Sequence, residues 1–303
     1  MDSSNKVRLG SGSVGRVYKG VLPSGQVVAI KHIYKSGISE SFRGEVDCLS
    51  KIRHPTLVCL FGCCVDNGEL FLVYEYCPYG NLAQQLLRKD SVLSWDKRVK
   101  ILRDSALALR FLHSYPEGRI VHRNIKLTNI LLTENLEPKL SDFGLAKMLG
   151  MEESKVFTEV KGTTGYMDPE YVRNSKLTCA SDVYSFGIVT LQILSGKGIT
   201  ELDLDARNHL TEEAKDVILG KLPLSHFGDP RLNGNLNDAD FYSILNVAVL
   251  CIADSSKWRP TMHLIFEELD KVWQNTVKNV VRVIFTDLSV ILRCWDYAND
   301  ILV

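Results

Sequence analysis

The sequence predicts an α+β protein in which a small lobe rich in β-strands precedes a larger helical lobe. The chain has 303 residues, more than one compact domain usually contains, which favours two lobes. Its first part consists mainly of short β-branched and aromatic runs that glycine, proline and asparagine separate. Beyond residue 80, apolar residues recur three and four positions apart, which is the period of an amphipathic helix.

Each lobe has its own set of expected elements. The expected strands are Val7–Leu9, Val14–Val21, Val27–His32, Leu57–Cys64 and Leu70–Tyr76. One helix interrupts them at Ser39–Ile52, because Phe42, Val46, Leu49 and Ile52 recur at helical spacing. In the second lobe we expect helices at Leu93–Leu112, Asp182–Ser195 and Asp240–Ala253.

Composition and charge exclude several classes of protein. Lys+Arg and Asp+Glu both number 36, so no overall field would attract nucleic acid, and no nucleic-acid partner is expected. No run of 18 uncharged apolar residues occurs, so no membrane-spanning segment is expected in this chain. The N-terminus has no apolar stretch typical of a secretory signal.

The eight cysteines predict a reducing compartment and no zinc site. They are scattered, form no C-x-x-C pair and have no histidines at zinc-ligand spacing. Such cysteines usually behave as small buried hydrophobic residues. We therefore expect a cytoplasmic protein, which a partner could bring to the inner face of the plasma membrane.

A glycine-rich turn near the N-terminus predicts a phosphate-binding loop. It reads Gly10-Ser-Gly12-Ser-Val-Gly15-Arg-Val17. Glycines at this spacing let backbone N–H groups approach phosphates closely. A dinucleotide-binding motif would need a helix directly after the glycines, but a strand and a hairpin follow. The G-x-x-x-x-G-K-[ST] phosphate-binding motif is absent.

A lysine and a glutamate follow at positions that suit the same site. Lys31 ends the apolar strand Val28-Ala29-Ile30-Lys31 and is placed to contact phosphates across the hairpin; a solvated strand end is the alternative. Glu45 lies on the next expected helix and could hold the ammonium group, with a surface glutamate as the alternative.

Together with later motifs, these residues resemble a protein kinase. The later motifs are His122-Arg-Asn124-Ile-Lys126-Leu-Thr-Asn129, Asp142-Phe143-Gly144 and Met167-Asp-Pro169-Glu170, and the resemblance covers about residues 6–274. Further segments look like the plant receptor-like and receptor-like cytoplasmic serine/threonine kinases, a group related to the interleukin-receptor-associated kinases. These are Leu-Val-Tyr74-Glu75-Tyr76, Gly162–Tyr171, Ser181–Gly187 and Trp258-Arg259-Pro260.

The resemblance implies the bilobal protein kinase fold and three regions. The N-lobe would be residues 1–79, the helical C-lobe residues 80–274, and residues 275–303 a C-terminal extension that is not kinase-like. The implied cofactors are ATP and Mg²⁺. Lys31 would contact the α- and β-phosphates and pair with Glu45, and Asn129 and Asp142 would hold the metal.

The resemblance also assigns the adenine pocket and the framework around it. The glycines Gly10, Gly12 and Gly15 would cover the phosphates, and Tyr74 would narrow the pocket. Val17, Ala29 and Leu131 would enclose the base, while Glu75 and Cys77 would flank the backbone that binds its edge. Lys126 would mark a serine/threonine-type catalytic loop. The framework would comprise a Glu170–Arg259 ion pair, Asp182 below the catalytic loop, and a stack of Leu49, Leu60, His122 and Phe143.

The chain departs from the family at position 124. The family has an aspartate there that accepts the proton of the substrate hydroxyl, and this chain has Asn124. An amide has no basic site at neutral pH. General-base catalysis contributes roughly 10²–10⁴-fold, so the barrier should rise by about 3–5 kcal/mol.

We therefore expect a domain that binds ATP·Mg with weak or no phosphotransfer. Such a pseudokinase would act as a signalling scaffold or allosteric partner of other signalling kinases or receptor complexes. The alternative is an active kinase that transfers the γ-phosphoryl group to serine or threonine hydroxyls of a protein substrate, because positioning and Mg²⁺ supply much of the acceleration.

Three residues of the catalytic loop and activation segment are expected to be regulatory. In the family, the arginine at position 123 meets a phosphate on the activation segment, here Leu145–Tyr166, and Thr158 is the expected phosphosite. Thr163 would instead contact the catalytic loop. The alternative for Arg123 is that it hydrogen-bonds loop carbonyl groups.

The C-terminal extension has a heptad-like apolar pattern. The pattern comprises Val277, Val281, Ile284, Leu288, Ile291 and Trp295. It favours a helix over a strand, although β-branched residues dominate the segment. A helix that packs on the second lobe or on a partner, and an extension without a selected function, both remain open.

Overall fold

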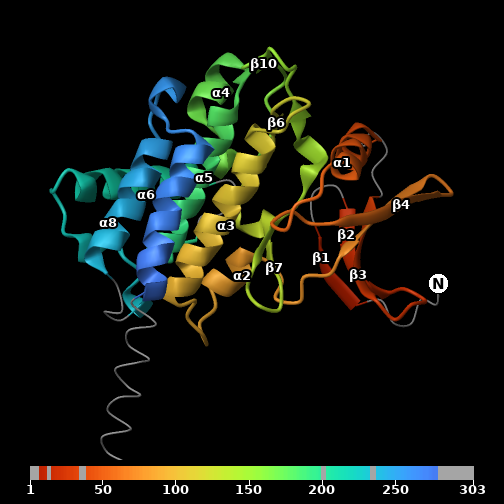
Figure 1. The fold of residues 1–303 in the computed structure, drawn as a ribbon, viewed down its shortest axis with the longest axis horizontal. Helices are drawn as coiled ribbons and strands as arrows, with labels where there is room; N and C mark the ends of the chain where they lie inside the picture. Colours follow the sequence, from red (N-terminus) through yellow and green to blue (C-terminus); the bar gives the residue numbers. More distant parts are fainter. Residues whose placement is uncertain (1–6, 12–14, 34–38, 199–202, 233–236, 279–303) are drawn as a thin grey trace, which may run out of the picture.

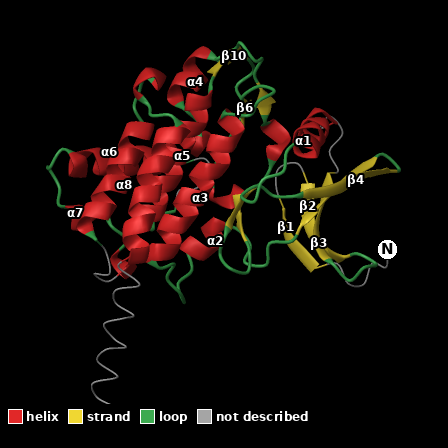
Figure 2. Cartoon of the chain, in the orientation of Figure 1, coloured by secondary structure: helices red, strands yellow, loops and turns green. Residues whose placement is uncertain are grey.

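The chain folds into two lobes of different composition. The computed structural model describes residues 7–11, 15–33, 39–198, 203–232 and 237–278. Strands gather in the lobe built from the first residues of the chain, and helices fill the other lobe (Figures 1 and 2). The α+β, two-lobed fold expected from the sequence is confirmed.

The first lobe is built on a five-stranded antiparallel sheet. Its order is β1-β2-β3-β5-β4, with β1 at Val7–Ser11, β2 at Gly15–Val21, β3 at Val27–Ile33, β5 at Glu69–Glu75 and β4 at Leu60–Asp66. The register places Val17 opposite Lys31 and Ala29 opposite Tyr74. An added Cβ on Gly15 would meet the carbonyl oxygen of His32, so this glycine allows β2 to begin close against β3.

One strand begins later than the sequence predicts. Residues from Leu57 were expected in the fourth strand, but β4 begins at Leu60. Leu57 instead forms an isolated parallel bridge with Leu140, and the Val58 N–H donates to the Leu140 carbonyl. These apolar residues therefore connect the two lobes rather than extend the sheet.

Helix α1 lies between the sheet and the start of the activation segment. It spans Ser39–Lys51, close to the expected range. Its buried side chains include Phe42, Glu45 and Leu49, so a glutamate occupies the apolar face of the helix. A charge in that place needs a partner, because burial of an unpaired carboxylate is costly.

The second lobe is built from helices around the almost fully buried α5. The helices are α2 (Leu82–Leu86), α3 (Trp95–His113), α4 (Pro169–Asn174), α5 (Cys179–Ser195), α6 (Leu204–Ile218), α7 (Leu224–Phe227), α8 (Asp238–Cys251) and a helix over 262–278. The sequence predictions near α3, α5 and α8 are confirmed. Helix α6 was not predicted, because it is mainly polar and buries only Leu210, Ala214 and Val217.

Short strands and 3₁₀ turns lie in the loops of the second lobe. The strands are β6 (Ile120–Val121), β7 (Ile130–Leu132), β8 (Pro138–Leu140), β9 (Lys147–Met148), β10 (Val156–Phe157) and β11 (Lys176–Leu177), which pair as β6–β9, β7–β8 and β10–β11. The 3₁₀ turns are η2 (Leu127–Asn129), η3 (Phe143–Leu145), η4 (Thr164–Tyr166), η5 (Pro230–Leu232) and η6 (Ser256–Trp258).

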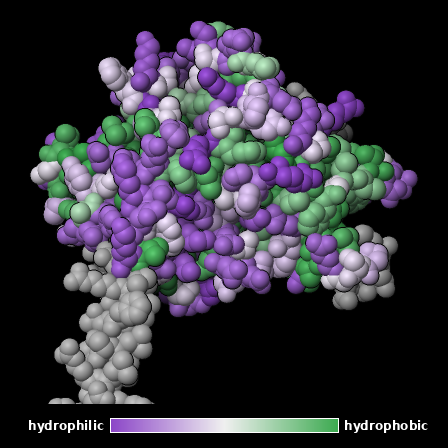
Figure 3. Space-filling view, in the orientation of Figure 1, coloured by the Kyte–Doolittle hydropathy of each residue, from purple (hydrophilic) through white to green (hydrophobic). Residues whose placement is uncertain are grey.

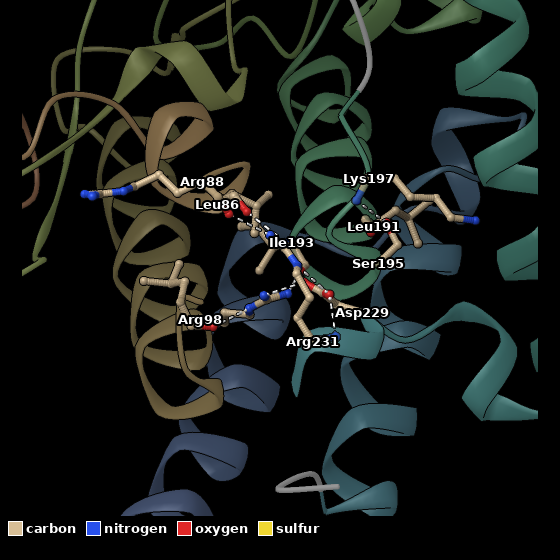
Figure 4. A network of polar contacts seen from close by, with 10 residues as sticks. Leu86, Arg88, Arg98, Leu191, Ile193, Ser195, Lys197, Asp229 and Arg231 are labelled. Atoms are coloured by element: carbon tan, nitrogen blue, oxygen red, sulfur yellow. Dashed lines mark hydrogen bonds and ion pairs between the residues drawn. The ribbon is translucent and has the colours of Figure 1, made fainter. Parts of the chain in front are cut away.

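A buried ionic cluster holds three helical segments of the second lobe together (Figure 4). The Arg98 guanidinium is fully buried and donates to the carboxylate of Asp229 at 2.6 Å and to the carbonyl oxygen of Ile193 at 2.6 Å. Arg231 donates to the same carboxylate at 2.7 Å and to the carbonyl oxygen of Leu86 at 2.9 Å. One carboxylate thus joins α3, the end of α5 and η5.

The Asp229 cluster predicts a pH-dependent contribution to stability. Burial alone would raise the pKa of Asp229, but hydrogen bonds from Arg231 and Arg98 outweigh it and lower the pKa to about 2. A lowered folded-state pKa stabilises the protein above the unfolded value and is lost as the pH falls through the folded value. We expect Asp229→Asn to reduce the free energy of unfolding by about 2 kcal/mol at pH 7. Denaturant unfolding of both proteins should show this gap falling to about half near pH 3.

An exposed pair provides the control for this prediction. Arg88 and Asp90 form a surface ion pair at 2.7 Å. Because solvent screens such a pair, Asp90→Asn should leave the free energy of unfolding unchanged across the same pH series. A gap for Asp229→Asn that does not change with pH would contradict the prediction.

The last described helix passes the expected domain limit without a break. It covers 262–278, and Asn275 within it donates to the carboxylate of Asp240 at 3.2 Å. Arg110 of α3 lies over the ring of Phe266, 4.0 Å from its centre, which fastens this helix to the lobe. The domain limits at 79 and 274 stay predictions, and the apolar pattern from Val281 to Trp295 lies outside the described residues.

Hydrophobic side chains are exposed at one edge of the sheet. Figure 3 shows a mainly hydrophilic surface over the helical lobe and hydrophobic colour around the β4 edge. Phe61 and Val65 of β4 are exposed, as are Cys63 and Cys64 between them. None of the described helices has the length and apolar character needed to cross a membrane.

Candidate active site

Lys31 is at the centre of an ionic contact between three residues. Lys31 Nζ lies 2.9 Å from Glu45 Oε2 and 2.8 Å from Asp142 Oδ1. The three residues come from β3, α1 and the residue before η3, so the contact joins both lobes. Gly144 permits this approach, because a Cβ there would meet the Ser41 hydroxyl of α1.

The electrostatics of the contact keep Lys31 and Asp142 charged. Burial would lower the pKa of Lys31, but the Glu45 and Asp142 carboxylates outweigh it and raise that pKa. Burial would raise the pKa of Asp142, and the Lys31 ammonium instead holds it below its usual value. The buried Glu45 carboxylate also accepts a hydrogen bond from the Phe143 N–H at 3.3 Å. The buried carboxylate on α1 therefore has its partner.

A buried aspartate, Asp182, holds the backbone of the catalytic loop, residues 122–129, in place. The Asp182 carboxylate of α5 accepts hydrogen bonds from the backbone N–H groups of His122 and Arg123 at 2.7 and 2.8 Å. Burial opposes ionisation of Asp182, but the hydrogen bond from His113 outweighs it and lowers the pKa. The contact of Asp182 with the loop matches the expectation, whereas His113, 2.9 Å from the carboxylate, was not anticipated.

His122 is part of the hydrophobic framework. Its ring is fully buried and lies edge-on to Phe143, with ring centres 4.8 Å apart. Nε2 lies 3.1 Å from the Ser141 carbonyl, and Nδ1 accepts from the Asn124 N–H. Burial lowers the pKa of His122, so the ring is neutral and both of its nitrogens are engaged. Leu49 and Leu60 are buried in the same core as Phe143.

Asp142 and Asn129 are the two residues expected to hold a metal. Asp142 has a left-handed backbone, with φ of 66°, which turns its carboxylate toward Lys31. Asn129 is buried, and its side-chain nitrogen donates to the Asn124 carbonyl at 2.7 Å. With that nitrogen engaged, the amide oxygen is the atom with which Asn129 would ligate a metal. A carboxylate and an amide oxygen fit Mg²⁺, which prefers oxygen ligands.

Asn124 itself contacts Asp142, the aspartate expected to hold a metal, and Thr163 of the activation segment. Its Nδ2 donates to Asp142 Oδ2 at 2.8 Å, and its Oδ1 accepts from Thr163 Oγ1 at 2.8 Å. The side chain is buried. Lys126 of the same loop adds positive charge near Asp142, after the larger effects of burial and Lys31.

The residues expected to flank the adenine lie at the end of β5 and just beyond it. Glu75 Oε1 accepts from the Cys59 N–H at 2.7 Å, and Lys139 Nζ lies 3.1 Å from the same carboxylate. These bonds fix the chain at the residue before the inter-lobe segment. Burial and the nearby Glu75 raise the pKa of the Cys77 thiol to about 12, so this cysteine is an uncharged wall residue.

The remaining residues assigned to the pocket occupy both lobes. Val17 and Ala29 lie on β2 and β3, and Leu131 lies on β7, bridged to Asn81. Tyr74 is buried, and its pKa is raised by burial and by the Glu45 carboxylate. Gly10 lies in β1 and Gly15 starts β2, whereas Gly12 lies outside the described residues.

Arg123 is joined to the activation segment through a tyrosine that the sequence did not single out. Arg123 Nη2 donates to the Glu159 carbonyl and to the Tyr171 hydroxyl, both at 2.8 Å. That hydroxyl donates to the Glu159 carbonyl at 2.9 Å and accepts from the Lys161 N–H at 3.2 Å. Thr158 precedes Glu159 in this segment. The carbonyl contact of Arg123 is present, and its role in binding a phosphate stays a prediction.

The ion pair expected between Glu170 and Arg259 is replaced by another pair. Arg259 donates to both carboxylate oxygens of Asp168, at 2.6 and 2.8 Å, and both side chains are buried. Glu170 instead accepts a hydrogen bond from the Ser256 N–H. Asp168 also accepts from the Glu170 N–H at the start of α4, which turns its carboxylate inward. The expectation for Glu170 was therefore wrong.

The two-lobed fold and the contact of Lys31 with Glu45 and Asp142 are those expected of a protein kinase domain. Comparison with known families matches residues 3–268 to the protein kinase domain. The chain belongs to the protein kinase family, and its relatives place it among the serine/threonine kinases.

The relatives are plant kinases of Arabidopsis thaliana. Serine/threonine-protein kinase PBS1 is 41% identical over 260 residues, which are 83% of this chain and 57% of that protein. Cysteine-rich receptor-like protein kinase 1 is 36% identical over 270 residues, 85% of this chain and 42% of that protein. A protein named as a probable leucine-rich repeat receptor-like protein kinase is 39% identical over 274 residues, 87% of this chain and 28% of that protein. The chain thus spans less than two thirds of each relative's length.

Proposed function

We propose that this domain binds ATP·Mg, transfers phosphoryl groups weakly or not at all, and acts as a signalling scaffold or allosteric partner. The observation that carries the proposal is Asn124, an amide in the place of the catalytic base, beside a complete Lys31–Glu45–Asp142 contact. Lys31 would hold the phosphates, and Asn129 and Asp142 would hold Mg²⁺. When bound, the metal would offset the negative charge of the phosphate oxygens.

The chemistry of Asn124 limits the reaction at one step. Its Oδ1 accepts a hydrogen bond from Thr163, and an amide oxygen does not take a proton at neutral pH. A substrate hydroxyl could be oriented near Asn124 and Lys126 but would keep its proton. Asn124 is therefore expected to slow proton transfer from the substrate hydroxyl, whereas nucleotide binding depends on other residues.

An active serine/threonine kinase is the second candidate. The favouring observation is that Lys31 and Glu45 are already paired and that His122 packs on Phe143, so the cleft needs no rearrangement. Much of phosphoryl transfer depends on positioning and charge, and a slow reaction without a base is chemically reasonable.

The proposed partners and location follow from the relatives. Their printed names include receptor-like kinases, which supports action beside other signalling kinases or receptor complexes. If the chain is active, a protein would be its substrate. A cytoplasmic position, at the inner face of the plasma membrane when a partner holds it there, agrees with this role. Thr158 remains the proposed phosphosite next to the carbonyl that Arg123 binds.

Incubation with labelled ATP and measurement of the melting temperature test the two parts of the proposal separately. ATP·Mg should raise the melting temperature of the wild-type chain, because a ligand that binds only the folded state stabilises it. Label should reach a generic basic substrate slowly or not at all. Absence of stabilisation would exclude nucleotide binding, and rapid labelling would favour the active kinase.

Lys31→Met should abolish the stabilisation by ATP·Mg. The change removes the ammonium group that meets Glu45 and Asp142 and would meet the phosphates. The melting temperature with and without ATP·Mg measures the effect. Lys221→Met is the matched control, because Lys221 is an exposed lysine paired with Asp216 on the far lobe. An equal nucleotide-dependent shift in both variants would show that Lys31 does not bind the nucleotide.

A further inference from the structure

We infer that Asn124 is a tether that keeps the metal-binding side of the cleft in place when no cation is bound. The inference rests on the proposed function only in assigning Asp142 to the metal site. Asn124 is thereby a positioning residue, which acts through Asp142 and Thr163. Its amide would keep the nucleotide-binding region ordered before a cation or a nucleotide binds.

Both ends of the Asn124 amide are engaged. Nδ2 donates to Asp142 Oδ2 at 2.8 Å, and Oδ1 accepts from Thr163 Oγ1 at 2.8 Å. An ionised carboxylate only accepts hydrogen bonds, so the amide nitrogen must face Asp142. A hydroxyl can donate to the opposite end. The chemistry of the two partners therefore fixes the orientation of the amide.

The backbone of Asn124 is fixed as well. Its carbonyl oxygen accepts from Asn129 Nδ2 at 2.7 Å, and its N–H donates to His122 Nδ1. Asn124 is 8% exposed, so water competes little for these bonds. The side chain therefore links Asp142 to Thr163, and the backbone that carries it is itself held by hydrogen bonds.

The tether completes the hydrogen bonding of the Asp142 carboxylate. Oδ1 lies 2.8 Å from the Lys31 ammonium, and Oδ2 accepts from Asn124. The cleft then contains the cation of Lys31 and the anions of Glu45 and Asp142. Each oxygen of Asp142 has a donor without any metal ion.

An aspartate at position 124 would reverse this arrangement. In the same side-chain conformation, its carboxylate oxygen would lie where the Asn124 nitrogen now donates to Asp142. Two anionic oxygens at that distance repel each other, and a cation or a change of conformation would be needed to separate them. The family's usual residue thus makes the arrangement depend on a cation, and Asn124 removes that dependence.

The tether also connects the metal site to the activation segment. Thr163 lies directly before η4 and follows Gly162, whose φ of 150° is available to glycine. The Tyr166 and Met167 N–H groups donate to the Thr163 carbonyl. Through Asn124, the turn at Thr163 is therefore held to the segment that begins at Asp142.

Hydrogen exchange of the nucleotide-free protein in EDTA tests the tether. The proteins compared are wild type, Asn124→Ala, Thr163→Val and the double variant. Asn124→Ala removes both bonds, so amide protons around residues 142–146 and 163–167 should exchange at least about tenfold faster. Thr163→Val removes only the bond to Thr163, so exchange around residues 163–167 should be about fivefold to tenfold faster, the ratio that one lost hydrogen bond supports. The double variant should add little beyond Asn124→Ala, because that change already removes both bonds.

Thr163→Ser is the conservative control for the same experiment. It keeps the hydroxyl and should restore the wild-type exchange rate, which a role in packing alone would not do. Wild-type exchange in both Asn124→Ala and Thr163→Val would overturn the tether. Additive effects in the double variant would overturn it as well.

A second arm uses MgCl₂ alone as the probe. In EDTA, Asn124→Asp should exchange as fast as Asn124→Ala around residue 142, and millimolar MgCl₂ should slow it again. Wild type should change less than twofold between EDTA and MgCl₂. An equal dependence on Mg²⁺ in wild type and Asn124→Asp would contradict the inference. Because no nucleotide is present, these results do not depend on whether the chain binds ATP.

Discussion

Asn124→Asp is expected to raise phosphotransfer from ATP·Mg to a serine- and threonine-containing peptide about 10²–10⁴-fold. The change supplies a carboxylate that can take the proton of the substrate hydroxyl. Lys31, Glu45, Asn129 and Asp142 already surround the site. The gain corresponds to about 3–5 kcal/mol in the barrier. Initial rates of peptide labelling, with saturating ATP and Mg²⁺, measure it.

Two further variants separate a base from other effects of the substitution. Asn124→Ala removes the amide without supplying a base and should stay at or below the wild-type rate. Lys31→Met combined with Asn124→Asp should lose the gained activity, which excludes a contaminating kinase. Equal rates for wild type and Asn124→Asp would show that the missing carboxylate does not limit this domain.

Asp168→Asn should lower the free energy of unfolding by about 3–5 kcal/mol. The amide keeps the shape of the side chain and an oxygen that can accept the Glu170 N–H at the start of α4. The loss would come from Arg259, whose buried guanidinium would keep its bonds to the Ala180 and Ala253 carbonyls but lose its anionic partner. Denaturant unfolding at neutral pH measures the change.

Glu170→Gln is the matched control, two residues further along the chain. Glu170 is less buried than Asp168 and accepts one backbone hydrogen bond, from the Ser256 N–H. An amide oxygen can accept the same bond, so the cost should stay below about 1 kcal/mol. A larger loss of unfolding free energy for Glu170→Gln than for Asp168→Asn would contradict this prediction. It would favour the Glu170–Arg259 ion pair expected from the sequence.

The sequence was sufficient for the elements with strong periodicity. Strands β2 and β3 are β-branched runs joined by a turn at Gly25, whose φ is 84°, and both were predicted. Helix α5 is apolar along most of its length. Helix α6 was missed, although Leu210, Ala214 and Val217 have the spacing of one buried helix face. Its other residues are mainly polar and hid that signal.

Local pattern could not decide which acidic residue of a motif turns inward. Asp168 and Glu170 flank Pro169 and are both plausible partners for Arg259. The choice depends on the geometry at the start of α4, where Asp168 accepts the Glu170 N–H and points to the core. A short side chain that caps a helix has a fixed direction, which was a usable signal.

The sequence predicted some of the long-range contacts of the site and not others. The Lys31–Glu45 contact was expected from motif order, and the structure brings the two residues together. The hydrogen bond from Asn124 to Asp142 joins residues 18 positions apart and depends on the conformations of both side chains, so it was not expected. Tyr171 was also missed as the partner of Arg123, since a tyrosine after a helix start gives no sign of its hydroxyl contacts.

The most direct test of the account measures binding and turnover of the same two proteins, wild type and Asn124→Asp. Calorimetric titration with Mg²⁺ and a non-hydrolysable ATP analogue gives the affinity, and peptide labelling gives the rate. We expect affinities within about tenfold of each other, because Asn124 is not itself assigned to nucleotide binding, and rates at least about a hundredfold apart. Failure of wild type to bind the analogue, or a wild-type rate equal to that of the variant, would contradict the account.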